Sequence, residues 1–289
     1  KFINQAIKKG ASAIISKKKK KYQKPSIRVK DVRKSLAEAS SNFYKKKPDN
    51  IIAVTGTNGK SSVANFFFQI LSFFKINVAS IGTLGIISKK FNKKTKLTSM
   101  DSLSLHKYLN ILAKKKIKNV ILEASSHGLH QKRLDNLNIK IGIFTNFSHD
   151  HLDYHKSIKS YFNAKMYLFN NLLKRNSLII TDEENKEYGY IKKIAEKKKI
   201  KKYTLGKDSG EIKILNNRYN QEKQIVDISF KSKKYTLEIP LIGYFQVKNL
   251  FMAMLAASKC GLNIEKIFKH LHKIKPVPGR NEKIFTLKN

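Results

Sequence analysis

IIAVTGTNGKSS, residues 51–62, is the stretch of sequence that decides the fold of this chain. An apolar run of strand length ends there in a turn with two glycines, and an apolar segment of helix length, Val63 to Phe74, follows at once. Gly56 and Gly59 allow the backbone to curl so that several N–H groups point inward, and the helix adds the positive end of its dipole. The order of strand, loop and helix therefore predicts a phosphate-binding loop.

Two side chains of this loop suit nucleotide chemistry. We expect Lys60 to reach the outer phosphates of a nucleotide and the Ser61 hydroxyl to bind Mg²⁺. The common pattern G-x-x-x-x-G-K-[ST] is not met, because Val54 stands where its first glycine belongs, and the shorter TGTNGKS remains. An ordinary strand, turn and helix with a chance lysine is the alternative, and the order of the elements favours the phosphate-binding loop.

Length and composition indicate a globular protein. The 289 residues suffice for one large domain or two, and a hydrophobic content of 41% argues against disorder. Cys260 is the only cysteine, so no internal disulfide forms and we expect a reducing compartment, the cytoplasm. No apolar run of membrane-spanning length and no signal peptide are visible. Because the chain begins with Lys1 rather than Met, we expect a fragment of a longer protein.

The charge is strongly basic, with 60 Lys and Arg against 20 Asp and Glu and a formal net charge of +40. Such a charge suggests a polyanionic partner. However, the lysines form short runs along the whole chain, mixed with Ile and Asn, and no aromatic-basic RNA-binding motif lies among them. A compositional drift on solvated faces explains this pattern, and a basic nucleic-acid-binding protein remains the alternative from another functional class.

The first 48 residues predict the end of a small α/β domain. We expect helices at Phe2–Lys9 and Asp31–Phe43, with Asp31 as a helix cap, and strands at Ala11–Ser16 and Ser26–Val29. The polar segment Lys45–Asp49 then interrupts the pattern and marks a domain boundary.

A second domain, residues 49–275, alternates strands with helices. This alternation predicts an α/β fold with a mostly parallel sheet covered by helices on both faces. After the first strand we expect strands at 78–81, 119–123, 141–145, 177–181 and 202–205, an antiparallel ribbon at 212–215, 225–230 and 235–239, and helices at 245–260 and 264–272. Two prolines and a glycine at 276–279 indicate that residues 276–289 are a linker toward a further domain.

Polar residues at the carboxyl ends of the strands are the candidates for a site, because ligands bind there in such sheets. Glu123 ends one strand and could supply the acidic ligand of a nucleotide-bound Mg²⁺, with a helix cap or a solvated carboxylate as the alternative. Another strand ends in NFSHDHLDYH, residues 146–155. This cluster lacks the HExxH glutamate and any cysteine, so a role for one histidine with Mg²⁺ or phosphate is favoured over catalytic zinc.

Lys165 lies in a predicted helix rich in apolar residues, YFNAKM at 161–166. In a chain with so many lysines, its position alone indicates a surface lysine.

These segments together resemble the Mur ligases, and within that family the enzymes that add the third amino acid of the peptidoglycan stem peptide. SSHGL-x-Q-x-R distinguishes this branch from the other Mur ligases and from folylpolyglutamate synthase. The matching segments are TGTNGKS at 55–61, EASSHGL at 123–129 with Gln131 and Arg133, TNFSHDHLDYH at 145–155, YFNAK at 161–165, GYFQVKN at 243–249 and PGRNE at 278–282.

The resemblance implies an ATP- and Mg²⁺-dependent ligase that joins an amino acid to UDP-MurNAc-L-Ala-D-Glu through an acyl phosphate. It implies meso-diaminopimelate as the amino acid, with L-lysine as the alternative, and a monomer without a membrane or specific nucleic-acid partner. The implied ATP-binding residues are Gly56, Thr57, Asn58, Gly59, Lys60, Ser61, Ser62, Asn249 and Arg280. The implied Mg²⁺ ligands are Ser61, Glu123, His151 and a carbamylated Lys165. The implied catalytic residues are Lys60, Glu123, His151 and Lys165. The implied contacts to the UDP substrate are Thr98, Ser99, Ser125, Gln131 and Arg133.

The chain departs from the family pattern in three residues and in extent. Ser99 replaces a threonine, Gln246 an asparagine and His149 an arginine that are common in the family. The start of the UDP-binding domain and the C-terminal domain with the amino-acid site are absent from this sequence. We therefore expect the chain alone to bind nucleotide weakly and to complete no ligation, and a folylpolyglutamate synthase-like ligase remains an alternative.

Overall fold

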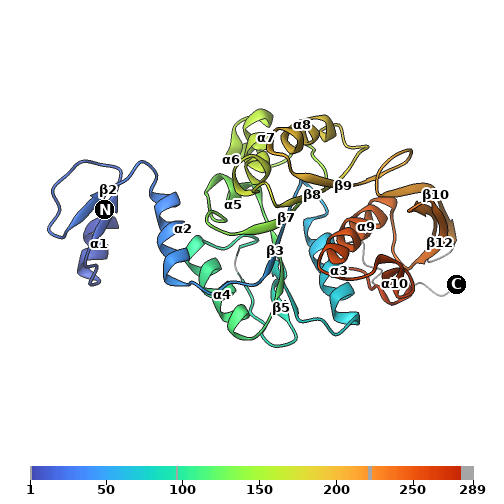
Figure 1. Ribbon diagram of the computed structural model, residues 1–289. Coiled ribbons are helices and arrows are strands. Elements are labelled where there is room, and N and C mark those ends of the chain that lie inside the picture. The colour runs from blue at the N-terminus through green and yellow to red at the C-terminus, as the bar shows by residue number, and fades with distance from the viewer. Residues whose placement is uncertain (1, 96, 221–222, 281–289) are drawn as a thin grey trace, which may run out of the picture.

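The computed structural model describes residues 2–95, 97–220 and 223–280, and within them a sheet of ten strands forms the centre of the molecule (Figure 1). In spatial order the strands are β12-β11-β10-β9-β8-β7-β3-β6-β4-β5. Their bounds are β3 Asn50–Thr55, β4 Val78–Gly82, β5 Gly85–Ser88, β6 Asn119–Glu123, β7 Ile139–Phe144, β8 Leu178–Asp182, β9 Lys201–Gly206, β10 Ile212–Asn220, β11 Lys223–Phe230 and β12 Lys233–Ile239.

The middle of the sheet is parallel and its edges are antiparallel. Strand β3 pairs in parallel with both β6 and β7, whereas β5 at one edge and β11 and β12 at the other run antiparallel to their neighbours. From β3 the chain first continues to one side of the sheet, through β4 and β6, and then crosses to β7 on the other side. The carboxyl end of β3 is therefore a topological switch point, where such sheets bind ligands.

Helices cover both faces of the sheet. Their bounds are α3 Lys60–Phe73, α4 Ser102–Lys114, α5 Ser126–His130, α6 Leu152–His155, α7 Ile158–Tyr167, α8 Tyr188–Lys198, α9 Tyr244–Lys259 and α10 Ile264–Phe268, with a π-helical turn at Leu168–Leu172 and a 3-10 turn at Leu271–Lys273. Helices α3 and α9 lie side by side on one face (Figure 1). Successive residues of β3 serve the two cores: Ile52 packs in the core of α3 and α9, and Ile51 in the core of α4, α7 and α8.

This architecture confirms the predicted fold class. The predicted ribbon forms three strands of the same sheet, and the first strand, the phosphate loop and its helix follow one another as expected. Two details differ. Helix α3 begins at Lys60 rather than Val63, and the helix predicted over 264–272 ends at Phe268 and resumes as a 3-10 turn. The sequence analysis also missed β5, which returns along β4 after a turn at residues 83–84 and begins at Gly85, where φ is +94°.

An N-terminal unit precedes the sheet. It contains helix α1 (Phe2–Lys8), the parallel strands β1 (Ile14–Ser16) and β2 (Ser26–Arg28), and helix α2 (Val32–Phe43), which packs beside α4 (Figure 1). Asp31 caps α2 as predicted, since its carboxylate accepts hydrogen bonds from the N–H groups of Arg33 and Lys34. The same carboxylate lies 2.6 Å from Lys132 Nζ. The domain boundary near residue 48 stays a prediction, and residues 281–289 of the predicted linker lie outside the described residues.

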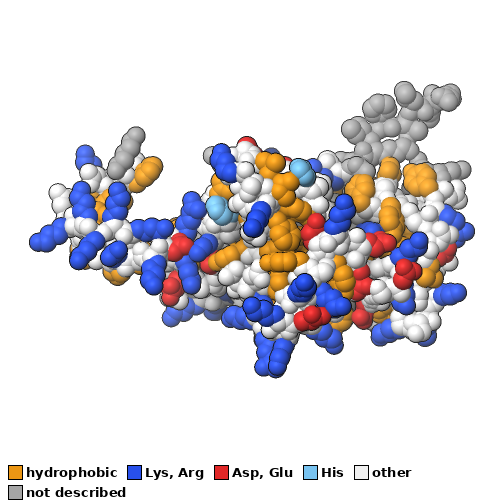
Figure 2. Space-filling model, turned by 90° about the horizontal axis from the view of Figure 1, so that it is seen from above, with side chains coloured by type: hydrophobic (Ala, Val, Ile, Leu, Met, Phe, Trp, Pro, Cys, Tyr) orange, Lys and Arg blue, Asp and Glu red, His pale blue; other side chains and the backbone are white. Residues whose placement is uncertain are grey.

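The face of the molecule seen in Figure 2 carries much of the excess of positive charge. Figure 2 shows Lys and Arg side chains along the whole length of the visible face. Within the described ranges, every helix is too short or too polar to cross a membrane.

The buried His106 of α4 makes the stability of this fold sensitive to acid. Its side chain is fully buried, Nε2 lies 3.2 Å from the Asp135 carbonyl oxygen, and burial together with the nearby charge of Lys47 lowers the pKa of His106 from 6.5 to about 4. Because the unfolded chain binds the proton more readily between pH 6.5 and 4, the free energy of unfolding falls as the pH falls through that window, by roughly 3 kcal/mol for this residue.

Replacing His106 with Leu is therefore expected to flatten the dependence of the unfolding free energy on pH between 6.5 and 4. Urea denaturation at several pH values measures this slope independently of the absolute stability. The exposed His272 changed to Leu serves as the control for loss of a histidine. An unchanged slope in the His106→Leu variant would contradict the prediction.

Candidate functional site

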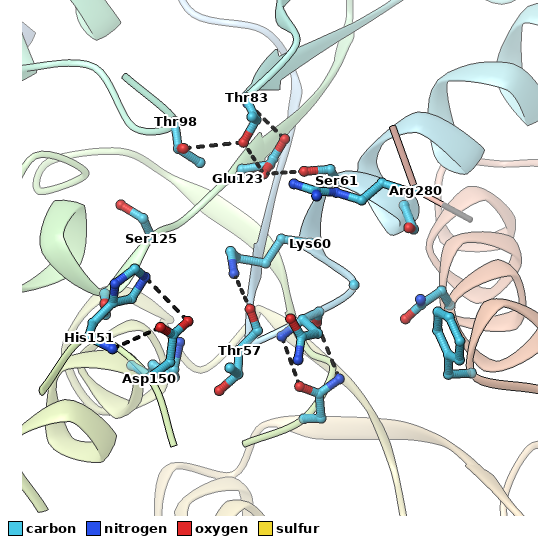
Figure 3. Close-up of a pocket in the computed structure, with 18 of the residues that line it drawn as sticks. Thr57, Lys60, Ser61, Thr83, Thr98, Glu123, Ser125, Asp150, His151 and Arg280 are labelled. Atoms are coloured by element: carbon cyan, nitrogen blue, oxygen red, sulfur yellow. Dashed lines mark hydrogen bonds and ion pairs between the residues drawn. The ribbon is translucent and has the colours of Figure 1, made fainter. Parts of the chain in front are cut away.

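A cavity of about 650 Å³ opens at the carboxyl ends of β3, β6 and β7, beside the start of α3 (Figure 3). It brings together segments that are far apart in the sequence. The lining residues are Thr57, Asn58, Gly59, Lys60, Ser61, Ser62, Thr83, Thr98, Glu123, Ser125, Ser126, Asn146, Asp150, His151, Lys165, Phe245, Gln246, Asn249 and Arg280. The predicted ATP-binding and metal-binding residues therefore lie at one cavity, apart from Gly56, which is not among the lining residues.

The two glycines of the loop are required by its geometry. Gly59 has a φ of +87°, and a Cβ atom there would lie 2.5 Å from Asn249 Oδ1. A Cβ atom on Gly56 would lie 1.9 Å from Thr145 Oγ1. The loop thus packs directly against the end of β7 on one side and against α9 on the other.

Hydrogen bonds to the segment after β7 hold the loop in place. The Asn58 N–H donates to Asn146 Oδ1 at 2.9 Å, and the Ser148 N–H donates to Thr57 Oγ1 at 3.0 Å. Thr57 Oγ1 also lies 3.2 Å from the Tyr161 hydroxyl of α7. Because these bonds are made by neighbouring elements, the loop is pre-shaped rather than dependent on a ligand for its conformation.

Lys60 lies at the centre of the cavity (Figure 3). Its Nζ donates hydrogen bonds to the carbonyl oxygens of Gly56 at 2.8 Å and Thr57 at 2.6 Å. Burial lowers the pKa of Lys60, while the charges of Glu123 and Asp150 act in the opposite direction. An ammonium group held by backbone carbonyls beside inward N–H groups is suited to binding phosphate oxygens.

Glu123 forms a compact group of oxygen atoms with its neighbours. Ser61 Oγ donates to Glu123 Oε2 at 2.8 Å, Thr83 Oγ1 donates to the same oxygen at 3.1 Å, and the Thr83 N–H donates to Oε1 at 2.9 Å. The Glu123 side chain is buried. A carboxylate and a hydroxyl oxygen at hydrogen-bond distance are the donor types that Mg²⁺ prefers, so these residues fit a magnesium ion.

Two histidines of the segment 146–155, His151 and His155, lie in different surroundings. His151 lines the cavity, and its N–H donates to Asp150 Oδ1 at 2.9 Å. His155 is buried against the Tyr161 ring, and burial is the main reason that its pKa falls to about 4. Among the described residues, no group of three or more His, Cys, Asp or Glu side chains is arranged to hold a metal ion. Metal binding by His151 stays a prediction.

Lys165 is buried, with 1% of its surface exposed, so the interpretation of this residue as a surface lysine is wrong. Its Nζ donates to the Gly56 carbonyl oxygen at 2.7 Å and lies 4.3 Å from the centre of the Tyr161 ring. Burial, and secondarily the charge of Lys60, lowers the pKa of Lys165 to about 6. Near neutral pH the amine is therefore mostly uncharged, and it can act as a nucleophile.

The residues predicted to bind the UDP substrate occupy two layers. Thr98 and Ser125 line the cavity. Ser99 lies behind them, where its Oγ donates to the Glu123 carbonyl oxygen at 2.8 Å. Arg133 donates through Nη1 to the Ser99 carbonyl oxygen at 2.5 Å and through Nη2 to Gln131 Oε1 at 2.7 Å, and neither Arg133 nor Gln131 is among the lining residues.

Several lining residues were not among the predicted site residues. Thr83 directly follows β4, so the rule that ligands lie at strand ends could have identified it. Asp150 belongs to the histidine cluster but was not given a role of its own. Phe245, with 51% of its surface exposed, is an accessible aromatic side chain at the start of α9; it lies in the matching segment GYFQVKN but was given no role of its own.

Comparison with known proteins identifies the central part of the chain. A family model described as the Mur ligase middle domain matches residues 54–257. A UDP-N-acetylmuramoyl-L-alanyl-D-glutamate--2,6-diaminopimelate ligase from Rickettsia bellii is 39% identical over 287 residues, which are 98% of this chain and 60% of the relative. An equally named protein from Agrobacterium fabrum is 35% identical over 100% of this chain and 59% of its own length. The chain thus spans 59–60% of these relatives.

Solved structures share the fold. A structure of a UDP-N-acetylmuramoyl-L-alanyl-D-glutamate--2,6-diaminopimelate ligase matches with a TM-score of 0.86 and 30% identity, over 96% of this chain and 58% of that one. MurF ligase from Thermotoga maritima, in complex with ADP, matches with a TM-score of 0.64 at 18% identity over 97% of this chain and 61% of that one. The apo form of FPGS from L. casei has a TM-score of 0.69 at 14% identity over 88% and 69%. The last two similarities establish only a common fold.

The close approach of β4 to Glu123 generates a test of the site. A Cβ atom on Gly82 would lie 2.0 Å from Glu123 Oε1, so Gly82→Ala must displace the carboxylate. We expect the Mg²⁺-dependent affinity for ATP, measured by isothermal titration calorimetry, to fall about tenfold or more. Gly189→Ala is the matched control, because a Cβ atom at Gly189 meets nothing within 4 Å. Equal affinities of the two variants would argue against a role for Glu123 in binding.

Proposed function

Because this chain belongs to the Mur ligase family through its middle domain, we propose that its cavity binds ATP and that the whole protein is an ATP-dependent peptide-forming ligase. The proposed substrate is UDP-MurNAc-L-Ala-D-Glu, and the proposed amino acid is meso-diaminopimelate, as in the names of the relatives. One observation carries the proposal: Lys60, the hydrogen-bonded pair Ser61 and Glu123, and the buried Lys165 all line one cavity.

The proposed reaction has two steps. The carboxylate of the D-Glu residue attacks the γ-phosphorus of ATP, which forms an acyl phosphate and releases ADP. The amine of the incoming amino acid then attacks the acyl carbon, loses a proton, and expels inorganic phosphate as the amide bond forms. Negative charge spreads over the transferring phosphoryl group, so positioning and electrostatic stabilisation are the main tasks of the protein.

Lys60 and the loop supply positive potential for the first step. The N–H groups of the loop and the start of α3 would contact the phosphates, and the Lys60 ammonium would exchange its carbonyl partners for phosphate oxygens. The Asn249 side chain packs against the loop at Gly59, and Arg280 lines the same cavity. These contacts support assignment of both residues to the nucleotide end of the site.

Magnesium would be held by Ser61 and Glu123. Their oxygen atoms are 2.8 Å apart, and both line the cavity beside Lys60. When bound, the ion would neutralise charge on the phosphates. His151, on the opposite wall from Ser61 in Figure 3, is the proposed ligand of a second ion together with a modified Lys165.

Lys165 is the proposed site of carbamylation. Its uncharged amine nitrogen would attack carbon dioxide and lose a proton, which yields an anionic carbamate in place of a neutral amine. The carbamate would bring a negative charge close to the Lys60 ammonium group, which shares the Gly56 carbonyl oxygen with Lys165. Such a carbamate has the charge and oxygen donors that Mg²⁺ requires.

The remaining parts of the substrate set are proposals as well. Thr98 and Ser125 would contact the UDP substrate directly, whereas Ser99, Gln131 and Arg133 would support them from behind. The folylpolyglutamate synthase alternative receives no specific support, since the similarity to FPGS lies at 14% identity and extends only to the fold. We propose a monomer in the cytoplasm.

The role of Lys60 predicts the first test. In the full-length protein, Lys60→Ala is expected to lower the rate of ligation at least about a hundredfold, because a preorganised charge on the transferring phosphoryl group is removed. Release of phosphate in the presence of UDP-MurNAc-L-Ala-D-Glu and meso-diaminopimelate measures this rate. Lys192→Ala, at an exposed position of α8, is the control. Ligation at a nearly normal rate by the Lys60 variant would refute the assignment.

The role of Lys165 predicts a dependence on carbon dioxide. The full-length enzyme should lose activity in buffer depleted of carbon dioxide and regain it when bicarbonate is added. Lys165→Gln should remain inactive under both conditions, whereas Lys159→Gln, at an exposed position of the same helix, should behave like the wild type. Intact-mass and structural evidence for an unmodified Lys165 in an active enzyme would contradict this role.

A further inference from the structure

Gln224 is a buried polar residue on the inward face of β11. Along this strand every second residue is buried, and the positions that follow Gln224 on the same face are Val226, Ile228 and Phe230. Only 1% of the Gln224 surface is exposed. A buried carboxamide costs free energy unless its hydrogen bonds are made, so its presence in an apolar row requires a reason.

The carboxamide of Gln224 fixes the segment that connects β12 to α9. Its Nε2 donates to the Leu241 carbonyl oxygen at 2.7 Å and to the Gly243 carbonyl oxygen at 3.1 Å, and its Oε1 accepts a hydrogen bond from Asn217 Nδ2 at 3.1 Å. Both protons of the amide group and its oxygen are therefore used. The contacts join two strands of the ribbon, β10 and β11, to the segment that connects β12 to α9.

Gly243 is the N-cap residue of α9, and no side chain of its own caps this helix. Its backbone has a φ of +90°, and its carbonyl oxygen accepts hydrogen bonds from both Gln224 Nε2 and the Gln246 N–H. Gln224 thus takes part in defining where α9 begins and in which direction its first turn points.

The first two turns of α9 form one wall of the nucleotide cavity. Phe245, Gln246 and Asn249 line it. Asn249 Nδ2 donates to Gln246 Oε1 at 3.2 Å, and the Asn249 carboxamide is so close to the loop that only glycine fits at position 59. A shift of the first turn of α9 would therefore move Gln246 and Asn249 relative to the phosphate loop.

We propose that Gln224 is a positioning residue for the nucleotide site, which places the first turn of α9 through its hydrogen bonds to Leu241 and Gly243. The proposal rests on the proposed function, because it concerns the same ATP-binding cavity. It gives the antiparallel ribbon a part in nucleotide binding, although none of the described residues of the ribbon lines the cavity.

Two substitutions test the hydrogen bonds of Gln224 while they keep the approximate size of its side chain. Gln224→Met keeps the approximate length and removes the hydrogen bonds, and Gln224→Glu keeps the shape but replaces the two N–H donors with a carboxyl group, which has one proton at most. The Leu241 and Gly243 carbonyl oxygens lose both donors in the Met variant and at least one in the Glu variant. Ile228→Val, on the same face of the same strand, is the control for a general loss of packing in the ribbon.

The experiment measures steady-state kinetics and the binding of ATP to the full-length proteins. We expect KM and Kd for ATP to rise about tenfold in both Gln224 variants, with KM for UDP-MurNAc-L-Ala-D-Glu unchanged. Hydrogen exchange of the backbone amides in residues 243–249 should become faster. Ile228→Val should lower the melting temperature without these effects.

The outcomes distinguish this proposal from the proposed function. If the wild-type enzyme binds ATP and Gln224→Glu binds it equally well, with unchanged exchange in residues 243–249, the positioning role is refuted and the proposed function stands. A change of KM for ATP that also occurs in Ile228→Val would likewise refute it. If the wild-type full-length protein binds no ATP, the proposed function fails. Should Gln224→Met not fold, Gln224→Glu and the exchange measurement still decide the question.

Discussion

The carbonyl oxygen of Gly56 is the point on which the site depends, because it accepts hydrogen bonds from the amino groups of two lysines. Lys60 approaches it from the loop itself, and Lys165 approaches it from α7 through the interior. The contact requires a glycine, since a Cβ atom at this position would overlap Thr145, the residue that follows β7. One peptide group thus joins the phosphate loop, the neighbouring strand and a helix more than 100 residues away in sequence.

The parts of the fold that follow from local physics were predictable from the sequence. The strand before the loop is apolar from Ile51 to Val54 because both of its faces are covered, and Asp31 caps a helix because its carboxylate can reach the N–H groups of the first turn. Glu123 was identifiable because it is the last residue of a buried strand, and ligands gather at that edge of a parallel sheet.

Long-range packing explains what the sequence did not reveal. The burial of Lys165 depends on the placement of α7 against the loop, and its position alone suggested a surface residue. The resemblance implies Gln131 and Arg133 as substrate contacts, which stays a prediction; the structure shows Arg133 donating to the Ser99 carbonyl oxygen and to Gln131 Oε1. The role of Gln224 was also not visible in the sequence, because Leu241 and Gly243 become its neighbours only when β12 pairs with β11.

The lysines illustrate the same contrast between what the local sequence reveals and what long-range packing determines. Of 60 Lys and Arg residues, Lys165 is the one that belongs to the buried set within the described residues. The lysines on exposed faces, unlike Lys60 in the cavity, can change in number with little effect on chemistry, because solvent screens exposed charges. Burial beside Lys60 raises the cost of a second positive charge and makes the Lys165 amine available for reaction near neutral pH. The chemical meaning of a lysine in this protein is therefore determined by its surroundings and not by the composition of the chain.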